Sequence, residues 1–428
     1  YTGTMTNSGT ITGVGLISFN GGITSSGTVN LGTGGAIAAA NSDFTGGTLN
    51  INGSTYTQTA GNLTLEILSR AAGSTIEFTG VGNQSLTSNG QSLYNVTINK
   101  SSGTFTAIDS TTLIVNLTVT NSGGVTFQSA VTAPTVTLTN TTGTIDFQGA
   151  VTATSLTTTG QGYNVRFRNG GTITNAVTFS NTGSLTIDAG FTFTGGVTKT
   201  VGAKSLAGTI STTNAPINLG TAGNITLTAD TTLSSGTGDI TLGGTVDADA
   251  AANNRSLTLN STGITTLGGE VGGTQVLLSL TTNAGGTTQI NGGAVTTTGV
   301  QTYGDAVTLG ADTTLTGSTV TFGGTLGNST SQTLDILGNA VFNGTVGAGT
   351  ALTSVTVSGT TAINGGSVNT SGIQTYTGNA TLGADTTLTG STVTFGGTLG
   401  NSTSQTLDIL GNAVFNGTVG AGTALTSV

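Results

Sequence analysis

Side chains that could carry acid–base or metal chemistry are scarce in this chain. It contains no histidine and no cysteine, so neither a histidine-based catalytic set nor a thiolate metal site can form. The closest acidic pair is Asp247 and Asp249 in the segment VDADAAANN, where carboxylates could hold a calcium ion in a loop or simply face solvent. The solvated loop is the simpler interpretation.

The remaining acids offer no catalytic cluster. Several stand alone, at Asp109, Asp188, Asp230 and Asp239, whereas hydrolysis of a sugar chain requires a pair of neighbouring carboxyl groups. Asp312 and Asp385 occupy the same position in two copies of a repeat (GADTTL), which favours a role in a turn. We therefore predict that the chain is not an enzyme, with no catalytic residue, no cofactor and no metal site.

Two kinds of polar or aromatic side chain could instead form a binding surface. Threonines recur in pairs two residues apart, at Thr118/Thr120, Thr137/Thr139, Thr157/Thr159 and Thr178/Ser180. This series resembles the flat threonine arrays of solenoid ice-binding proteins, although threonine is also an ordinary outward residue of a strand. Five of the tyrosines are too dispersed for a carbohydrate-binding platform: Tyr56, Tyr94, Tyr163, Tyr303 and Tyr376.

The elements that position these side chains are visible in residues 123–188. Short apolar pairs recur there at a fixed 20-residue spacing, each after a glycine: Val125/Phe127, Ile145/Phe147, Val165/Phe167 and Leu185/Ile187. Within each copy, apolar and polar residues alternate as in a strand with one buried face. A strand that returns at a fixed period predicts a β-solenoid, in which successive turns stack about 4.8 Å apart.

This register also predicts charge pairs. It places Asp146 beside Arg166, and Arg168 beside Asp188, each one turn apart. Opposite charges on neighbouring strands contribute roughly 0.2–1 kcal/mol. We expect Arg166→Asp to destabilise the fold and Asp146→Arg to restore it, unless the 20-residue spacing is a coincidence of low complexity.

Repeat length divides the chain into three segments. Residues 1–90 are an irregular start, residues 91–220 have 20-residue turns, and residues 221–428 are built of 73-residue repeats. In the last segment, residues 308–355 recur identically as 381–428, and about four turns of 18 residues would fill each repeat. We predict an all-β parallel β-solenoid with about 18–20 residues per turn, forming a single elongated rod.

Composition excludes several partners. Seven basic and 16 acidic residues give a net charge of −9, and no base follows Arg255, so binding of nucleic acid through phosphate contacts is excluded. No apolar run approaches the length that a membrane-spanning helix needs, so we expect no membrane insertion by a helix. The chain begins at Tyr1 and its last residues lie within a repeat, and we expect it to be a segment of a longer exported protein.

Two stretches are similar to bacterial exoproteins. Tyr56-to-Ile67 (YTQTAGNLTLEI) resembles a motif of autotransporter passenger domains. Tyr94-to-Asn121 and the 73-residue repeats resemble the strand-repeat regions of filamentous haemagglutinin-like adhesins. The resemblance implies a right-handed parallel β-helix, secretion, and a role in adhesion or surface structure at the bacterial cell surface. It transfers no binding residue to this chain.

These observations favour a non-catalytic structural or adhesive shaft of an extracellular bacterial surface fibre. One alternative is a filament or sheath subunit that polymerises end to end through uncapped strands. A second is a β-helix that binds or cleaves polysaccharide. The expected partners are further copies of the chain, end to end or lateral, other surface or matrix components, and a glycan or host cell-surface ligand.

Overall fold

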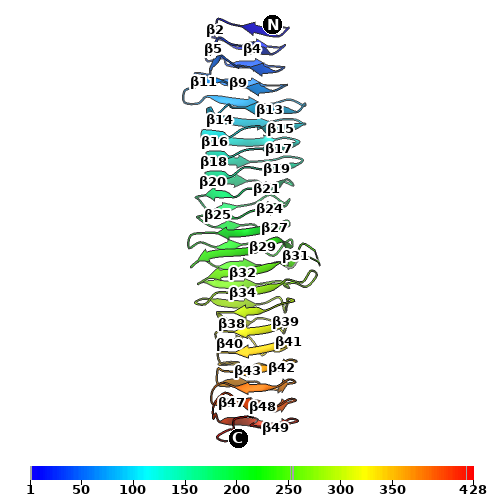
Figure 1. Ribbon diagram of the computed structural model, residues 1–428. Helices are drawn as coiled ribbons and strands as arrows, with labels where there is room; N and C mark the ends of the chain where they lie inside the picture. The colour runs from blue at the N-terminus through cyan, green and yellow to red at the C-terminus, as the bar shows by residue number, and fades with distance from the viewer. Residues whose placement is uncertain (1, 251, 253–254, 421) are drawn as a thin grey trace. The chain divides into compact units, whose positions relative to one another are not determined.

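The computed structural model describes residues 2–250, 252, 255–420 and 422–428, and within them every helix or strand assigned is a β-strand. Successive turns of chain lie against one another through parallel strand pairs (Figure 1). The predicted all-β parallel β-solenoid is therefore confirmed, with about 20 turns. No described segment is a helix of the length and apolarity needed to cross a bilayer.

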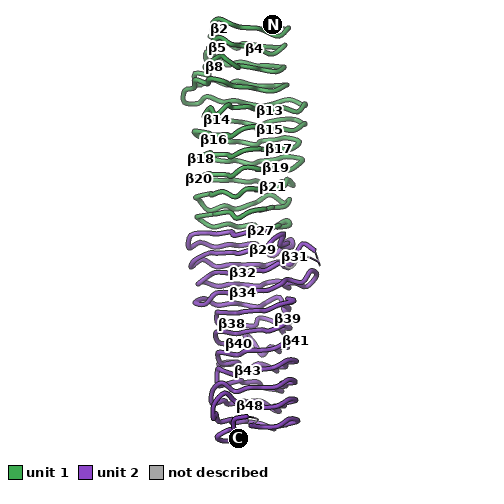
Figure 2. Tube along the Cα trace, in the orientation of Figure 1, with its two compact units in different colours: residues 1–205 green, residues 206–428 purple. Residues whose placement is uncertain are grey.

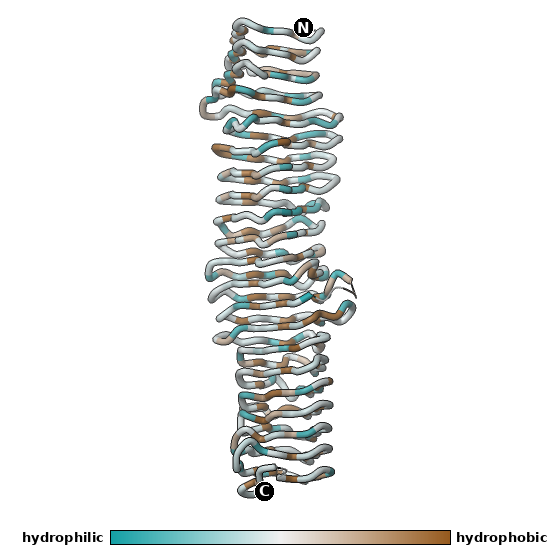
Figure 3. The backbone as a smooth tube through the Cα atoms, in the orientation of Figure 1, coloured by the Kyte–Doolittle hydropathy of each residue, from teal (hydrophilic) through white to brown (hydrophobic). Residues whose placement is uncertain are grey.

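The chain divides into two compact units, residues 1–205 (unit 1) and 206–428 (unit 2), coloured separately in Figure 2. Each turn of either unit has three faces. In each unit apolar residues recur at similar places in successive turns (Figure 3), and many of their side chains are buried. Strand β27 (Lys204–Ser211) runs across the division in sequence.

The three faces of unit 1 are formed by strands that recur once per turn. Face I comprises β1 (Met5–Asn7), β4 (Ile23–Ser25), β7 (Ser42–Asp43), β10 (Leu63–Thr64), β13 (Gln84–Thr87), β15 (Thr104–Ala107), β17 (Gly124–Phe127), β19 (Thr144–Phe147), β21 (Asn164–Phe167) and β24 (Leu185–Ile187). Face II comprises β3 (Ile17–Phe19), β6 (Ala36–Ala38), β9 (Thr55–Gln58), β12 (Thr75–Phe78), the C-terminal parts of β14 (Ser92–Asn99), β16 (Thr111–Asn121), β18 (Val131–Leu138) and β20 (Val151–Thr158), and the pair β23 (Val177–Thr178) and β26 (Val197–Thr198). Face III comprises β2 (Thr10–Gly13), β5 (Thr28–Leu31), β8 (Thr48–Asn50) and β11 (Ile67–Ser69), then the N-terminal parts of β14, β16, β18 and β20, and finally β22 (Gly171–Ile173) and β25 (Phe191–Phe193).

Unit 2 repeats this plan. Face IV comprises β28 (Ile217–Asn218), β30 (Ile240–Leu242), β33 (Ile264–Leu267), β35 (Thr287–Ile290), β38 (Ala306–Leu309), β40 (Leu326–Asn328), Val346, β44 (Ser367–Asn369) and the N-terminal parts of β47 (Thr386–Phe395) and β49 (Leu407–Phe415). Face V comprises the start of β29 (Ile225–Gly236), β31 (Val246–Ala248), Val271, β36 (Ala294–Thr296), the N-terminal parts of β39 (Thr313–Phe322) and β41 (Thr333–Phe342), β42 (Ser354–Val357), β45 (Ile373–Tyr376) and the ends of β47 and β49. Face VI comprises the end of β29, β32 (Ser256–Ser261), β34 (Ser279–Thr282), β37 (Gln301–Tyr303), the C-terminal parts of β39 and β41, β43 (Thr361–Ile363), β46 (Ala380–Leu382) and β48 (Leu399–Asn401).

Turn length varies more than the sequence predicted. Val125 pairs with Ile145 at the expected 20-residue spacing, and Val307 pairs with Leu326 at a spacing one residue shorter. Ile240 pairs with Thr265, and Thr231 pairs with Leu257, so these turns are several residues longer. The predicted turn length is therefore correct for many turns but too short for this part of unit 2, where longer loops join the strands.

The 73-residue repeat does not correspond to four complete turns of the solenoid. Val307 lies in a column on face IV that continues through Leu326 and Val346 to Val368, three turns later. Ala380, which is the equivalent of Val307 in the next copy, is on face VI instead. Each repeat thus makes three turns and two further faces, fewer than the four turns expected, and equivalent residues of the two copies lie on different faces.

Glycine allows the long strands to pass from one face to the next. Gly338 has a φ of 155°, and a Cβ there would overlap the carbonyl oxygen of Gly317. Gly411, its equivalent in the second copy, has a φ of 154° and the same close contact with Gly390. Because no side chain fits at these positions, both copies can make the same corner only with glycine.

Candidate functional site

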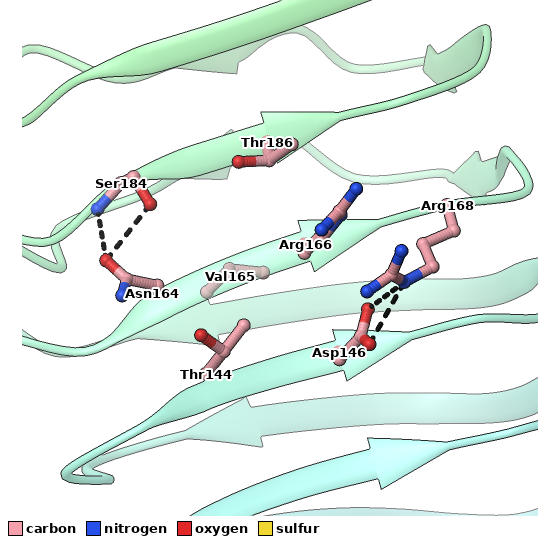
Figure 4. A pocket seen from close by; sticks show the side chains of 8 residues that line it. All are labelled: Thr144, Asp146, Asn164, Val165, Arg166, Arg168, Ser184 and Thr186. Atoms are coloured by element: carbon pink, nitrogen blue, oxygen red, sulfur yellow. Dashed lines mark hydrogen bonds and ion pairs between the residues drawn. The ribbon is translucent and has the colours of Figure 1, made fainter.

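The largest gathering of charge in unit 1 lies on face I and comprises Asp146, Arg166, Arg168 and Asp188, here called the arginine–aspartate cluster. Asp146 on β19 pairs in register with Arg166 on β21, and Arg166 pairs with Thr186 on β24. The 20-residue stacking predicted for these strands is therefore confirmed. Figure 4 shows Asp146, Arg166, Arg168 and Thr186 on the outer surface of successive turns.

The ion pairs of the cluster, however, run diagonally. Arg168 Nε lies 2.8 Å from Asp146 Oδ1, and Arg166 Nε lies 2.5 Å from Asp188 Oδ2. The predicted placement of Asp146 beside Arg166 is confirmed, but the ion pairs expected between direct neighbours, Asp146 with Arg166 and Arg168 with Asp188, are wrong. Because an arginine side chain is longer than the spacing between turns, its guanidinium group can reach the aspartate that lies two positions further along or back on the neighbouring strand.

A shallow depression of about 200 Å³ lies over this cluster. Its lining consists of Thr144, Asp146, Asn164, Val165, Arg166, Arg168, Ser184 and Thr186 (Figure 4). The Arg166 and Arg168 side chains are 37% and 40% exposed, and both ion pairs use Nε. The hydrogen bond to Asp146 raises the pKa of Arg168, so this guanidinium stays charged. The remaining guanidinium nitrogens can donate to a carboxylate or sulfate, but two acids already balance the two bases.

The serine hydroxyl in this depression is not arranged as a nucleophile. Ser184 Oγ and Ser184 N both donate to Asn164 Oδ1, at 3.0 and 2.8 Å. An amide oxygen cannot take up a proton as a general base would. In this arrangement Ser184 Oγ is hydrogen-bonded to an amide oxygen and not to a general base.

The proposed calcium pair of unit 2 is engaged in other contacts. Asp247 is buried, and its Oδ1 accepts hydrogen bonds from the backbone N–H groups of Thr274 and Gln275. Asp249 forms an ion pair with Arg255, with N–O distances of 2.9 and 3.0 Å. Positions 251, 253 and 254 of that segment lie outside the described residues, and no group of three or more acids that could hold a metal occurs among those described.

The isolated acids bind the backbone of neighbouring turns. Asp109 accepts from Ser88 N and Oγ, one turn earlier. Asp230, Asp239, Asp312 and Asp385 each accept from a backbone N–H of the following turn, at 2.8 or 2.9 Å, the donors being Ser256, Ile264, Thr333 and Thr406. Asp312 and Asp385 were expected to form tight turns of the chain. Their role is more specific, because each carboxylate links one turn of the solenoid to the next.

Four of the five dispersed tyrosines are core residues. Tyr56, Tyr163, Tyr303 and Tyr376 are at most 1% exposed, and burial raises the pKa of each hydroxyl. Tyr303 OH donates to Gln301 Oε1, and Gln301 Nε2 donates to Val295 O and Thr316 O. Tyr376 and Gln374 make the equivalent bonds in the second copy. This buried glutamine–tyrosine cluster was missed by sequence reasoning, although the recurring Gln-Thr-Tyr was its signal.

Three buried lysines of unit 1 were also missed. Lys100, Lys199 and Lys204 are at most 1% exposed. Lys100 Nζ donates to Gly82 O and Gln84 Oε1, and Lys199 Nζ donates to Asn181 O. Burial, and to a smaller extent the charge of Lys204, lowers the pKa of Lys199 to about 8. Lys100 follows Ile98 by two positions and Lys199 follows Val197 by two, so the strand alternation placed both side chains inward.

The predicted threonine series is only partly formed. Thr118, Thr137 and Thr157 stack in register on face II. Thr178 is on β23, which pairs with β26. Thr159 Oγ1 donates to the carbonyl oxygen of Thr139, so this hydroxyl is occupied by the solenoid itself. The series therefore spans three paired turns and is less available to a ligand than its sequence suggested.

Comparison with protein-family models, curated protein sequences and solved structures gives no match for this chain. The evidence that bears on function is therefore the geometry of the two units and the chemistry of their outer faces.

Proposed function

We propose that this chain is the shaft of an extracellular bacterial surface fibre, a non-catalytic element that sets the distance between adhesive parts and the cell. One observation carries the proposal. The 73-residue repeat of unit 2 reproduces its buried glutamine–tyrosine cluster with nearly the same distances, although Gln301 is on face VI and Gln374 is on face V. A block, meaning one 73-residue repeat, makes the same internal contacts whichever face it begins on. Such a block can be added or removed without disturbing a unique site.

The polar groups support the same interpretation. The isolated acids and the buried glutamines use their hydrogen-bonding capacity to join neighbouring turns. Stability then comes from contacts between adjacent turns, as expected for a protein whose useful property is its length. The similarity of Tyr94-to-Asn121 and of the 73-residue repeats to haemagglutinin-like strand repeats supports secretion and a place at the bacterial surface.

Variants that differ in the number of blocks test this proposal. A first variant ends after Val355, which removes one block, and a second carries one additional copy of residues 308–380. We expect both to fold, with each block changing the particle length in electron micrographs by about 18 Å, because three turns and two faces rise by roughly 4.8 Å per turn. A control insertion of the same residues in scrambled order should fail to add ordered turns.

Two outcomes contradict the proposal. A block variant that loses its β-sheet circular dichroism would show that the repeats depend on more than their neighbours. Long ordered filaments of many chains would favour the alternative of a self-polymerising filament or sheath subunit.

A second candidate function is recognition of an acidic polysaccharide at the arginine–aspartate cluster. It is supported by the half-exposed guanidinium groups around the depression. Binding of polygalacturonate that is weakened by Arg166→Gln and Arg168→Gln, but not by Arg255→Gln, would favour it. Equal binding by all three variants would remove it.

A further inference from the structure

Face III of unit 1 carries a more regular array of threonines than the one found in the sequence. A first column comprises Thr112, Thr132, Thr152, Thr172 and Thr192, each paired in register with the next. A second column, two positions further along each strand, comprises Ile114, Pro134, Thr154, Thr174 and Thr194. Backbone hydrogen bonds from Thr174 N to Ala153 O and from Thr194 N to Ile173 O keep the second column aligned. These two columns are called the threonine grid.

The hydroxyl groups at the centre of the grid are available. Thr132, Thr152, Thr154, Thr172 and Thr174 are exposed. None of these five side chains makes a hydrogen bond with another part of the described chain, in contrast to Thr159 on face II. Threonine is β-branched and has few side-chain rotamers to lose, so ordering these hydroxyls on a ligand costs little entropy.

A trough lies between the two columns. It has a volume of about 250 Å³ and is lined by Leu113, Thr132, Ala133, Pro134, Thr152, Ala153, Thr154 and Thr174. Threonine hydroxyls flank the trough on both sides at Thr152/Thr154 and at the next turn, Thr172/Thr174, whereas Pro134 stands opposite Thr132, so the row of similar sites begins at Thr152. Molecules that occupy such a row would repeat at the spacing of the turns, about 4.8 Å.

The grid is too small for a stable protein interface. Four intervals between turns give it a length of about 19 Å, and two positions along a strand give a width of about 7 Å. A specific protein partner normally covers roughly 800 Å² on each side, several times this area. The grid also has no charged residue for an ionic ligand and no aromatic ring for stacking against a sugar.

We propose that the threonine grid binds the surface of ice. A crystalline face of water presents neutral donors and acceptors at a fixed repeat, which a rigid array of hydroxyl and methyl groups at regular spacing can match. Each hydroxyl contributes little by itself, but water molecules ordered in the trough join the groups of successive turns into one lattice-like row. The activity is independent of the proposed shaft, which needs no ligand on face III.

The test uses the whole chain and single ice crystals grown slowly in its solution. The expected result is that the labelled chain partitions into the ice and that the crystals develop facets. Thr152→Lys places a long charged side chain at the centre of the grid and should abolish both effects. Thr157→Lys is the matched control, because Thr157 is an exposed threonine of the same strand, β20, on face II.

Thermal unfolding followed by circular dichroism establishes that each variant is folded. If Thr152→Lys does not fold, Thr174→Lys replaces it, since Thr174 follows the end of β22 and lies outside a strand. Exclusion of the wild-type chain from ice would overturn the proposal. So would a folded grid variant that still enters ice, or loss of activity in Thr157→Lys alone.

Discussion

Units 1 and 2 share a three-faced turn but differ in how their repeats fit it. In residues 125–187 of unit 1 the period of the sequence repeat equals the number of residues in one solenoid turn, so each residue type returns to the same face. In unit 2 the 73-residue repeat ends on a different face, so Val307 and Ala380 occupy faces IV and VI. A period equal to the turn concentrates a chemical feature on one side, as in the threonine grid and the arginine–aspartate cluster. A period that differs from it distributes identical features around the stack.

The aromatic cores reflect the same difference. Phe147 in unit 1 lies between Phe127 and Phe167, with ring centroids 5.0 and 5.2 Å apart and nearly parallel planes. In unit 2 each repeat has its own short stack, Tyr303–Phe322–Phe342 in one copy and Tyr376–Phe395–Phe415 in the other. Unit 1 thus has a longer aromatic column, and unit 2 has shorter ones that restart in each repeat.

Phe147→Ala should have the largest effect on stability. Removing a buried ring from a packed core costs about 3–5 kcal/mol. Phe342→Ala, which removes a ring with one aromatic neighbour at 5.6 Å, should cost less by about 1 kcal/mol, because only one stacking contact is lost. Urea unfolding of the two variants, with hydrogen exchange followed separately over residues 1–205 and 206–428, measures the difference. An equal loss would contradict the distinction between long and short columns.

Gln301→Leu and Gln374→Leu should destabilise unit 2 by similar amounts. Each substitution leaves a buried tyrosine hydroxyl without its acceptor, at a cost of about 1–3 kcal/mol, while the carbonyl oxygens of Thr316 and Thr389 keep the backbone N–H groups of Thr297 and Thr370. The two positions are on different faces but make equivalent hydrogen bonds. Urea midpoints that differ widely between the two variants would show that the copies are not self-contained.

Unit 1 should become more stable as the pH rises above 8, and unit 2 should not. Burial lowers the pKa of Lys199 from 10.5 to about 8, so between these values the unfolded chain binds more protons than the folded one. The penalty for burying the lysine is therefore full below pH 8 and is relieved as the pH approaches 10.5. Unit 2 contains no lysine. Melting temperatures from pH 7.5 to 9.5 should rise less in Lys199→Met than in the wild type, and a parallel rise would argue against this origin.

The smallest effect is expected at the arginine–aspartate cluster. Arg166→Asp breaks the ion pair with Asp188 and should cost about 0.2–1 kcal/mol, because the pair is partly exposed. The added substitution Asp188→Arg should restore stability, whereas Asp146→Arg should not, since it would place a second guanidinium against that of Arg168. A double-mutant cycle from urea unfolding at low salt distinguishes the two. Rescue by Asp146→Arg would favour pairing directly along the column over pairing along the diagonal.

Much of the fold was readable from local patterns, but side-chain pairing was not. The alternation in Val125-Thr-Phe127 and its copies predicted the strands, their inward faces and the 20-residue stacking. The diagonal ion pairs depend on how far an arginine reaches across a sheet, which strand alternation does not encode. The threonine grid was missed because its columns are on face III, and the sequence search followed the less regular series on face II.

The sequence by itself determined that the chain is an all-β solenoid with an apolar interior, because a period-two pattern recurring once per turn can bury its side chains only by stacking. It also determined that histidine and thiolate chemistry are absent, because those residues do not occur. The tertiary structure decided on which face each repeated residue lies. That depends on the length of every turn and on corners such as Gly338, and small differences in these accumulate along the stack until equivalent residues point in different directions.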